Sequence, residues 1–282
     1  MTLRLSANEK GPYISVNRST DPTQTKTLRD EYRRELQRPL RELKGKLREG
    51  IIERGSLDMA FNQPMPQFRF EHDPTAVAHF GDWLRGELNS GYLQTVTENN
   101  NRFVRTSYSK AVVMADTNLR SLGFDVDDSV ESVLNRPVHQ RKLQQLYTRN
   151  FRLLDGVTRD MERDLRQTLS QGLVAGKDPF AVARDINQRV DNVGMHRSTL
   201  IARTEIINAH TEATLERYKE LGVEHVTIEA ELITAGDHRV CPICAGFEGI
   251  VRTPSDWENS ERPPFHPQCR CRVIPITPAT RI

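Results

Sequence analysis

Residues 200–232 read LIARTEIINAHTEATLERYKELGVEHVTIEAEL, and within this stretch the pattern of the chain changes from helical to strand-like. Ser198 or Thr199 is suited to cap a helix over residues 200–221, and Gly222 is suited to end it. The ten residues that follow alternate and are rich in β-branched side chains, which predicts a strand. The stretch therefore predicts a helical region before it and a small β-containing region after it.

The residues before this stretch carry apolar side chains at steps of three and four, the pattern of amphipathic helices. Pro39 lies inside the first helix and should bend it or divide it in two. Asp73-Pro74 and Asp178-Pro179 each pair an N-cap residue with a proline at the first helical position. We expect long helices over residues 25–54, 73–96, 99–122, 138–173 and 180–190, and a short one that ends before Pro137.

We therefore predict an α+β fold, with a predominantly helical, elongated N-terminal region and a small β-rich C-terminal domain. Besides residues 223–232, the segments GIVRTP (249–254) and CRVIPI (271–276) have the composition of short strands. The first residues mix Asn, Ser, Pro, Asp and Thr without periodicity, which is typical of a flexible arm. The expected division is a flexible arm over 1–23, a helical domain over 24–194 and a C-terminal domain over 195–282.

The charge balance limits the classes of partner. Forty basic residues against 38 acidic ones give a net charge of +2, which offers no electrostatic case for bulk nucleic-acid binding. A membrane span is not expected because the chain has no run of eighteen apolar residues. We also expect synthesis in a cytoplasm, since the N-terminus lacks the apolar core of a secretory signal. In that compartment, cysteines serve more often as metal ligands or free thiols than as disulfides.

The four cysteines all lie between positions 241 and 271, which points to one local role. Cys241 and Cys244 form a CxxC pair, His266 and Cys269 form an HxxC pair, and Cys271 follows two residues later. Ligands of this kind, converging from two turns, favour structural Zn²⁺. Five candidates exist for four places: either Cys241, Cys244, His266 and Cys269 bind the metal, or the four cysteines bind it and His266 has another role. Redox-active, disulfide-bonded or inert thiols are the alternatives, although no βαβ unit precedes Cys241, as a thioredoxin-like motif would require.

Three elements of the sequence together resemble a known family. They are the run Ile201-Ala-Arg-Thr-Glu205 with Asn208 and Ala209, the run Asp237-His-Arg-Val-Cys241-Pro-Ile-Cys244, and the run Pro263-Pro-Phe-His266-Pro-Gln-Cys269-Arg-Cys271. In order and spacing they resemble the C-terminal domain of the head morphogenesis proteins of tailed phages, the family that includes the minor head protein of phage Mu. The resemblance covers residues 195–276.

Residues around the Cys/His knuckle have expected supporting roles. Arg203 or Glu205 could hydrogen-bond the turns that carry the ligands, as residues around structural metal sites often do. Asp237 could cap the turn before Cys241 or orient the imidazole. Arg270 and Arg272, on either side of Cys271, are expected to be surface charges.

The resemblance implies a structural component of the virion, present in few copies at the portal vertex or the capsid interior, and made in the host cytoplasm during assembly. The implied partners are the portal protein, the major capsid or scaffolding protein, and packaged DNA, with roles in head assembly and in DNA packaging or delivery. No enzymatic activity is expected.

Three other functions are weighed against this interpretation. A metal-dependent nuclease would use Asp237, His238 and His266, but it needs converging carboxylates and an open metal position. A zinc-dependent DNA-binding adaptor would need a basic face beside the knuckle, for which Arg262, Arg270, Arg272 and Arg281 are the candidates. An ADP-ribosyl transferase, an enzyme sometimes joined to domains of this family, is disfavoured because no β-rich NAD-binding pattern is present.

Overall fold

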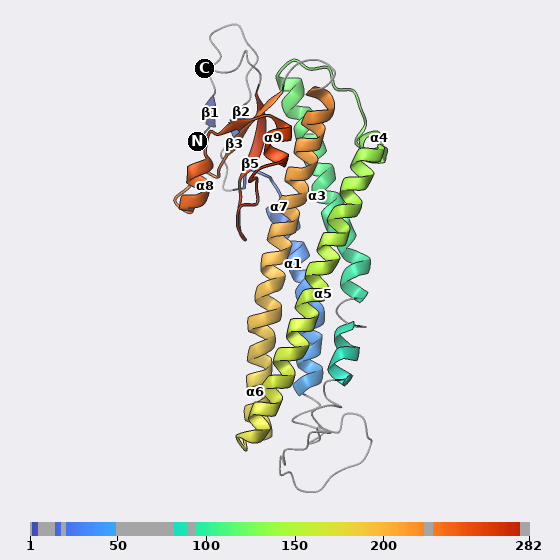
Figure 1. Cartoon of the computed structure of the whole chain (residues 1–282), viewed down its shortest axis with the longest axis vertical. Helices are drawn as coiled ribbons and strands as arrows, with labels where there is room; N and C mark the ends of the chain where they lie inside the picture. The colour runs from blue at the N-terminus through green and yellow to red at the C-terminus, as the bar shows by residue number, and fades with distance from the viewer. Residues whose placement is uncertain are drawn as a thin grey trace. The chain divides into compact units, whose positions relative to one another are not determined.

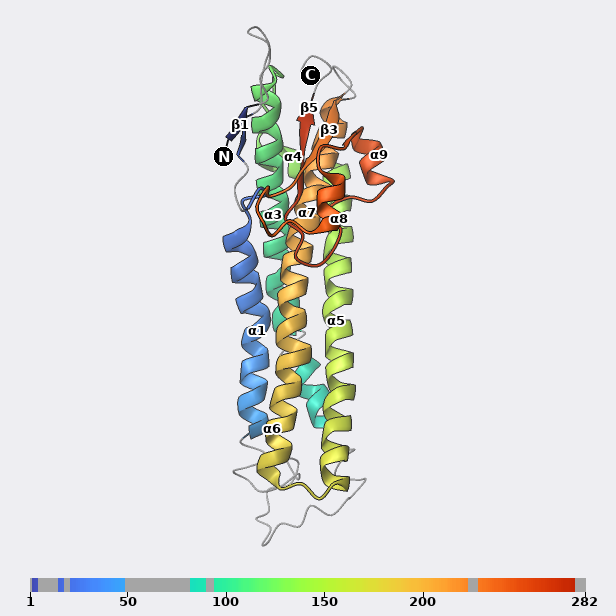
Figure 2. The same ribbon diagram turned by 90° about the vertical axis from the view of Figure 1, so that its left-hand side faces the viewer.

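A computed structural model describes residues 2–4, 15–17, 21–48, 82–89, 94–222 and 228–276, which are mostly helical (Figures 1 and 2). These residues belong to two compact units. The sheet unit comprises Met1–Asp30, Asn101–Thr148 and Arg203–Ile282, and the helical unit comprises Glu31–Asn100 and Arg149–Ala202. The domain limits expected from the sequence stay predictions, and each unit is described by itself below.

The long helices occur where the apolar stripes predict them. They are α1 (Lys26–Arg48), α3 (Gln94–Ser121), α5 (Pro137–Val174), α6 (Pro179–Val190) and α7 (His196–Gly222), with the short α4 (Val130–Asn135) and a helical segment over 82–89. Asp178 caps α6 as expected, because its side chain accepts a hydrogen bond from the Ala181 N–H at 3.0 Å. Pro39 does not divide α1, which runs unbroken through it. The expected helix start at Asp73 and the connection over 55–72 lie outside the described residues.

The predicted helix cap at Ser198 or Thr199 is wrong. The chain passes from α6 through a π-helical turn, Asp191–Met195, directly into α7, so no helix begins at residue 200. The two hydroxyls instead donate to carbonyl oxygens four residues earlier: Ser198 to Gly194 at 2.7 Å and Thr199 to Met195 at 3.0 Å. Ser and Thr side chains can make this bond inside a helix as well as at its start, and composition alone does not distinguish the two.

The helical unit has a leucine-rich core. Its largest buried side chains come from α1, the 82–89 segment and α5, and include Tyr32, Leu36, Leu40, Leu84, Leu88, Met161 and Leu165. Tyr32 donates its buried hydroxyl to Asn150 at 2.8 Å. Gly194, in the π-helical turn, marks a close approach: a Cβ there would stand 2.5 Å from Met161 Cε and 2.8 Å from Leu40 Cδ1. A side chain at position 194 would therefore require the ends of the Met161 and Leu40 side chains to shift.

The sheet unit contains a three-stranded antiparallel sheet in the order β4-β3-β5, formed by β4 (Val251–Arg252), β3 (Glu229–Ile233) and β5 (Arg272–Ile276). Two short helices, α8 (Pro242–Phe247) and α9 (Pro254–Glu258), lie in the connections. Trp257 of α9 is fully buried and donates its indole N–H to the Ala230 carbonyl at 2.8 Å. The sheet residues share one core with Leu119, Leu215 and Tyr218 of the helices, which fixes the sheet beside α7 (Figure 1).

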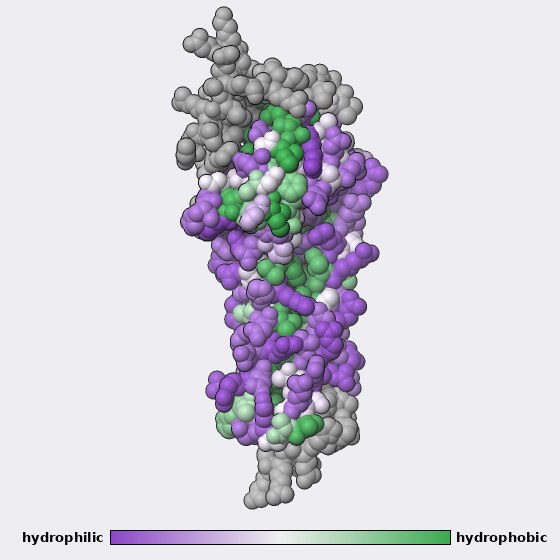
Figure 3. Space-filling view, turned by 60° about the vertical axis from the view of Figure 1, so that its left-hand side comes forward, coloured by the Kyte–Doolittle hydropathy of each residue, from purple (hydrophilic) through white to green (hydrophobic). Residues whose placement is uncertain are grey.

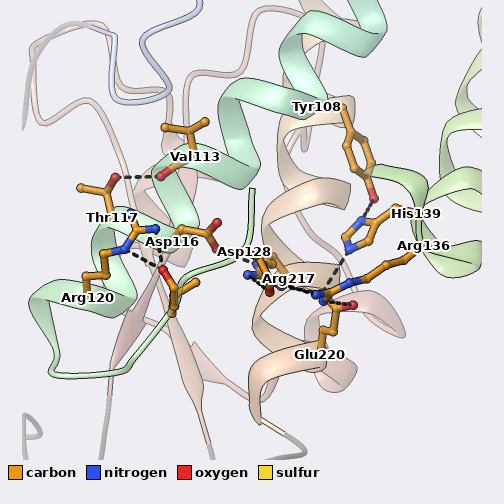
Figure 4. A network of polar contacts seen from close by, with 11 residues as sticks. Tyr108, Val113, Asp116, Thr117, Arg120, Asp128, Arg136, His139, Arg217 and Glu220 are labelled. Atoms are coloured by element: carbon orange, nitrogen blue, oxygen red, sulfur yellow. Dashed lines mark hydrogen bonds and ion pairs between the residues drawn. The ribbon is translucent and has the colours of Figure 1, made fainter. Parts of the chain in front are cut away.

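Helix α7 is buried on every side from Glu205 to Tyr218, although it carries many polar residues. The best-connected of these is Arg217, which forms ion pairs with Asp116, Asp128 and Glu220 (Figure 4). Arg136 also pairs with Asp128 and Glu220. Because Glu220 can only accept, His139 donates Nε2–H to it at 3.3 Å, and its Nδ1 accepts the Tyr108 hydroxyl at 2.7 Å. We call Tyr108, Asp116, Asp128, Arg136, His139, Arg217 and Glu220 the Arg217 network.

The N-terminal arm contains one ordered feature that the sequence does not predict. Strands β1 (Thr2–Arg4) and β2 (Ser15–Asn17) pair antiparallel, with Leu3 opposite Val16. The paired strands are too far apart in sequence for a short turn motif to announce them. Among the described residues, no helix is both long and apolar enough to cross a membrane.

Candidate metal centre

The first turn of α8 brings Cys241 and Cys244 together. Cys241 is the N-cap residue, and its sulfur accepts a hydrogen bond from the Cys244 N–H at 3.4 Å. Pro242 follows at the first helical position, where its fixed φ favours the turn. As a result, both sulfurs lie at the start of one short helix.

The second turn runs from His266 to Cys269 and presents the imidazole. It is closed by a hydrogen bond from the Cys269 N–H to the His266 carbonyl at 3.1 Å, with Gln268 in the left-handed region at φ +77°. His266 Nδ1 lies 2.7 Å from the Pro267 carbonyl oxygen, which can only accept. Nδ1 therefore carries the proton, and the unprotonated Nε2 lies 3.2 Å from Cys241 Sγ and 3.1 Å from Cys244 Sγ. A metal-binding imidazole needs this tautomer.

Cys269 and Cys271 complete the cluster from the start of β5. The Sγ atoms of Cys244 and Cys269 are 3.9 Å apart. Two groups have ligand atoms within 4.8 Å of one another: Cys241, Cys244 and His266, and Cys244, Cys269 and Cys271. Cys244 belongs to both groups, so the five residues expected from the sequence form two adjoining groups joined at Cys244.

The donor set fits a tetrahedral zinc ion. Ligands at the usual Zn–S length in a tetrahedron stand about 3.8 Å apart, close to the Cys244–Cys269 separation. Without a cation, the thiols cannot all ionise together. A hydrogen bond with Cys269 and burial raise the pKa of Cys244 and Cys271, while hydrogen bonds from these two thiols lower the pKa of Cys269 to about 3. A divalent cation would relieve this repulsion and stabilise the remaining thiolates.

Asp237 organises the segment before Cys241. It accepts two hydrogen bonds from Arg270, at 2.7 and 2.6 Å, and one from the Arg239 N–H at 3.0 Å. The bonds from Arg270 hold the pKa of the Asp237 carboxyl well below its usual range. Asp237 thus joins the loop before Cys241 to the residue between Cys269 and Cys271.

The other two expected supporting residues, Arg203 and Glu205, lie in different surroundings. Arg203 of α7 donates to the Gln268 side chain at 3.1 Å and so contacts the turn between His266 and Cys269. Glu205 is buried within α7. The expectation that Arg270 and Arg272 are surface charges is wrong, since Arg270 is paired with Asp237 and Arg272 is only 6% exposed. Each of these arginines directly follows a cysteine of the cluster. The fold that brings the cysteines together therefore also turns the arginines inward.

Carboxylates near the cluster are bound to other partners. Glu258 of α9 pairs with Lys142 and Lys219, and Glu248 accepts the Thr234 N–H at 2.8 Å. Among the described residues, neither group of close metal-ligating side chains contains a carboxylate. His238 is exposed. The site is therefore built of sulfur and imidazole donors.

The sequence does not predict the ion pairs that hold α9 against the helices. Lys142 of α5 contacts Glu258 of α9 and Glu212 of α7, and Arg262 contacts Glu212 as well. The pairs join residues up to 116 positions apart, for which sequence spacing gives no signal. They anchor the connection between the two ligand-bearing turns.

The fold and the cluster define a class: a mostly helical protein with a small antiparallel sheet and a thiolate–imidazole centre. Residues 163–274 match the family model described as phage Mu protein F like protein. This match confirms the resemblance to the phage head morphogenesis family. It begins earlier than residue 195, within α5, and includes all of α6 and α7. No curated protein and no solved structure matches the chain.

Proposed function

We propose that the chain is a minor capsid protein of a tailed virus, located at the portal or in the capsid interior, where it supports head assembly and DNA packaging or delivery. The observation that carries the proposal is the family match over residues 163–274. That region extends from the last third of α5 into β5 and contains every residue of the Cys/His cluster.

The Cys/His cluster has a structural role in this proposal. Four protein ligands close a zinc site and leave no position open for substrate. Zinc held there would join the start of α8 to the turn at His266 and to the start of β5. These segments are short, and α8 has only six residues, so the metal would supply stability that a small core supplies poorly.

A structural role also agrees with the surroundings of the cluster, and we propose that the chain has no catalytic turnover. Asp237 and Glu258, the carboxylates of this region with the most extensive contacts, are each held by two basic side chains. A nuclease would need such carboxylates to bind a catalytic metal and position water. Here they connect segments of the chain.

The helical surface supports protein partners. Exposed faces of α5 carry ion pairs of mixed sign, including Arg159–Asp155 and Arg163–Asp160. The face in Figure 3 is largely hydrophilic, with apolar residues in narrow patches. Surfaces of this kind favour specific docking on proteins over bulk DNA attraction. We therefore propose that residues 25–190 attach to the portal, the major capsid protein or a scaffolding protein.

Localisation in particles tests the proposal. Heads would be purified from a virus encoding the full chain and from the same virus with the gene deleted, grown in cells that carry an empty plasmid. An asymmetric cryo-EM reconstruction of each would give a difference map. We expect difference density at the portal vertex or inside the shell, restored by a plasmid that carries the intact gene. A chain that is abundant in lysates but absent from purified heads would contradict the proposal.

A further inference from the structure

Two buried arginines in the sheet unit have N–H donors that no described residue accepts. Arg29 is 5% exposed, and its Nε and Nη1 donate no hydrogen bond within the described part of the chain. Arg272 is similarly buried, and its Nε has no acceptor among the same residues. Such groups are normally paired, because burial removes the water that would otherwise solvate the charge.

His210 is a third buried side chain of this kind. It lies on the all-buried part of α7, and neither of its ring nitrogens has a hydrogen-bond partner among the described residues. Burial first, and then the nearby charges of Arg272 and Arg29, lower the pKa of His210 to about 3. Both arginines are therefore near enough to His210 to act on its charge. Among the described residues, eight buried side-chain nitrogen and oxygen atoms lack a partner, and five of them belong to these three side chains.

The charges around this cluster do not balance. Asp21 accepts a hydrogen bond from Arg29 Nη2 at 2.6 Å, and Asp30 is also near Arg29. Two further arginines, Arg203 and Arg270, are near enough to lower the pKa of Arg29, although burial is the larger cause. Arg270 is matched by Asp237.

Arg272 is the residue without a counterion. Within the described part of the chain it forms no ion pair. It donates to the Met114 sulfur, and it lies near the Tyr218 phenol, whose pKa is raised by burial. A thioether is only a weak acceptor, and a neutral phenol supplies no negative charge. The cluster thus holds one uncompensated positive charge and a set of unused donors.

We propose that Arg29, His210 and Arg272 form a binding site for an oxyanion of the phosphate class. The guanidinium groups offer planar forks of N–H donors that match tetrahedral oxyanions, and the imidazole adds one more N–H. Water could satisfy hydrogen bonds here but would not neutralise Arg272. The oxyanion is a free phosphate ion or the terminal phosphate of a nucleic-acid strand, since both present the same group.

The test measures thermal unfolding of the purified full chain at constant ionic strength. Sodium chloride is exchanged stepwise for inorganic phosphate, and zinc content is measured in each sample to exclude loss of metal. We expect a saturable rise in Tm, because a ligand that binds only the folded state stabilises it. The Arg272→Met variant should lose this rise, whereas Arg141→Gln, a change at an exposed arginine of the same unit, should retain it.

A second variant and a second probe protect the test. If Arg272→Met does not fold, Arg29→Gln replaces it, with loss of the phosphate response again expected. A short DNA strand with a 5′-phosphate and the same strand without it identify the source of the oxyanion. If only the phosphorylated strand competes with phosphate for the site, the ligand is a strand terminus. If neither strand competes with phosphate, the ligand is the free ion. A Tm that is unchanged by phosphate, or that rises equally in Arg272→Met, would overturn the proposal. So would saturable stabilisation by an acidic peptide without any response to phosphate.

Discussion

Arg217 and Arg272 are both buried in the sheet unit, but the chain treats their charges in opposite ways. Arg217 is fully buried and contacts three carboxylates, Asp116, Asp128 and Glu220. Arg272, among the described residues, contacts none. A buried charge is stable when its partners are supplied, and the chain supplies them all for Arg217. The difference separates a network completed by the chain from a cluster that an outside ion completes.

The Cys/His cluster resembles Arg272 in this comparison, except that it would bind a cation and Arg272 would bind an anion. It gathers donors that would ionise around a cation, and within the described residues neither ligand group contains a positively charged side chain. Buried Arg217, by contrast, needs nothing from solution. We therefore expect metal to change the stability of the Cys/His cluster, and anions to change the stability around Arg29, His210 and Arg272. The Arg217 network should respond only to mutation and acid.

The largest expected effect is that of zinc. The purified chain should contain close to one zinc ion per molecule, and Cys241→Ser should lose it. Binding energy at structural zinc sites is roughly 10 kcal/mol or more and is largely folding energy, so residues 229–276 should lose hydrogen-exchange protection. The measurements are elemental analysis and hydrogen exchange followed by mass spectrometry.

Two further variants identify the fourth ligand in the same experiment. Whichever of Cys271→Ser and His266→Asn keeps the metal marks a residue outside the coordination sphere. Protection over the α3 and α5 helices serves as the internal control, because these helices contribute no metal ligand. A native, metal-free chain with four freely titrating thiols would remove the metal site altogether.

The second effect is the loss of Arg217. Arg217→Met leaves Asp116, which is nearly fully buried, without its counterion and should cost about 3–5 kcal/mol of unfolding free energy. Arg272→Met should remain within about 1 kcal/mol of the wild type in phosphate-free buffer, since it removes a charge that has no partner. Urea unfolding of both variants at neutral pH measures the difference. Equal losses would show that the two arginines are equally well compensated.

The third effect is a dependence on pH through Glu220. Burial raises the pKa of this carboxyl, but hydrogen bonds from His139, Arg136 and Arg217 outweigh burial and lower the pKa from 4.5 to about 2. The folded-state pKa is therefore below the unfolded-state value. The stabilisation is complete above the unfolded pKa of 4.5 and is lost as pH falls toward 2.

Glu220→Gln isolates this contribution from the other carboxyl groups. The wild type should be more stable than the variant by roughly 2 kcal/mol at neutral pH, and the gap should narrow as pH falls from 5 to about 2.5. Urea titrations of both proteins at several pH values give the gap directly. A gap that stays constant over this range would mean that Glu220 has no lowered pKa in the folded chain.

Local patterns in the sequence predict much of the fold and the members of the Cys/His cluster. The stripe of α5, the cap at Asp178 and the paired spacing at Cys241 and His266 all act over a few residues, where periodicity and turn chemistry carry the signal. The coordination set remains a prediction, because four cysteines and one histidine offer five ligands whatever the fold.

Long-range polar contacts escape the sequence pattern. Arg217 meets Asp116 and Asp128 across 101 and 89 positions, and α7 carries so many polar residues that it resembles an exposed helix. The inward position of Arg272 is missed for a related reason. Alternation along a strand tells which residues share a face, but it does not tell which face is covered.

The π-helical turn at Asp191–Met195 joins α6 to α7 without a break. Such turns arise where a single extra residue enters an α-helix, and the widened turn absorbs that residue so that the helical turns on either side keep their faces. Deleting a residue from the regular part of α7 would instead rotate everything beyond it by roughly 100°. Arg217, His210 and the apolar residues between them are set by that phase. A change of length by one residue should therefore be better tolerated in the π-helical turn than within α7.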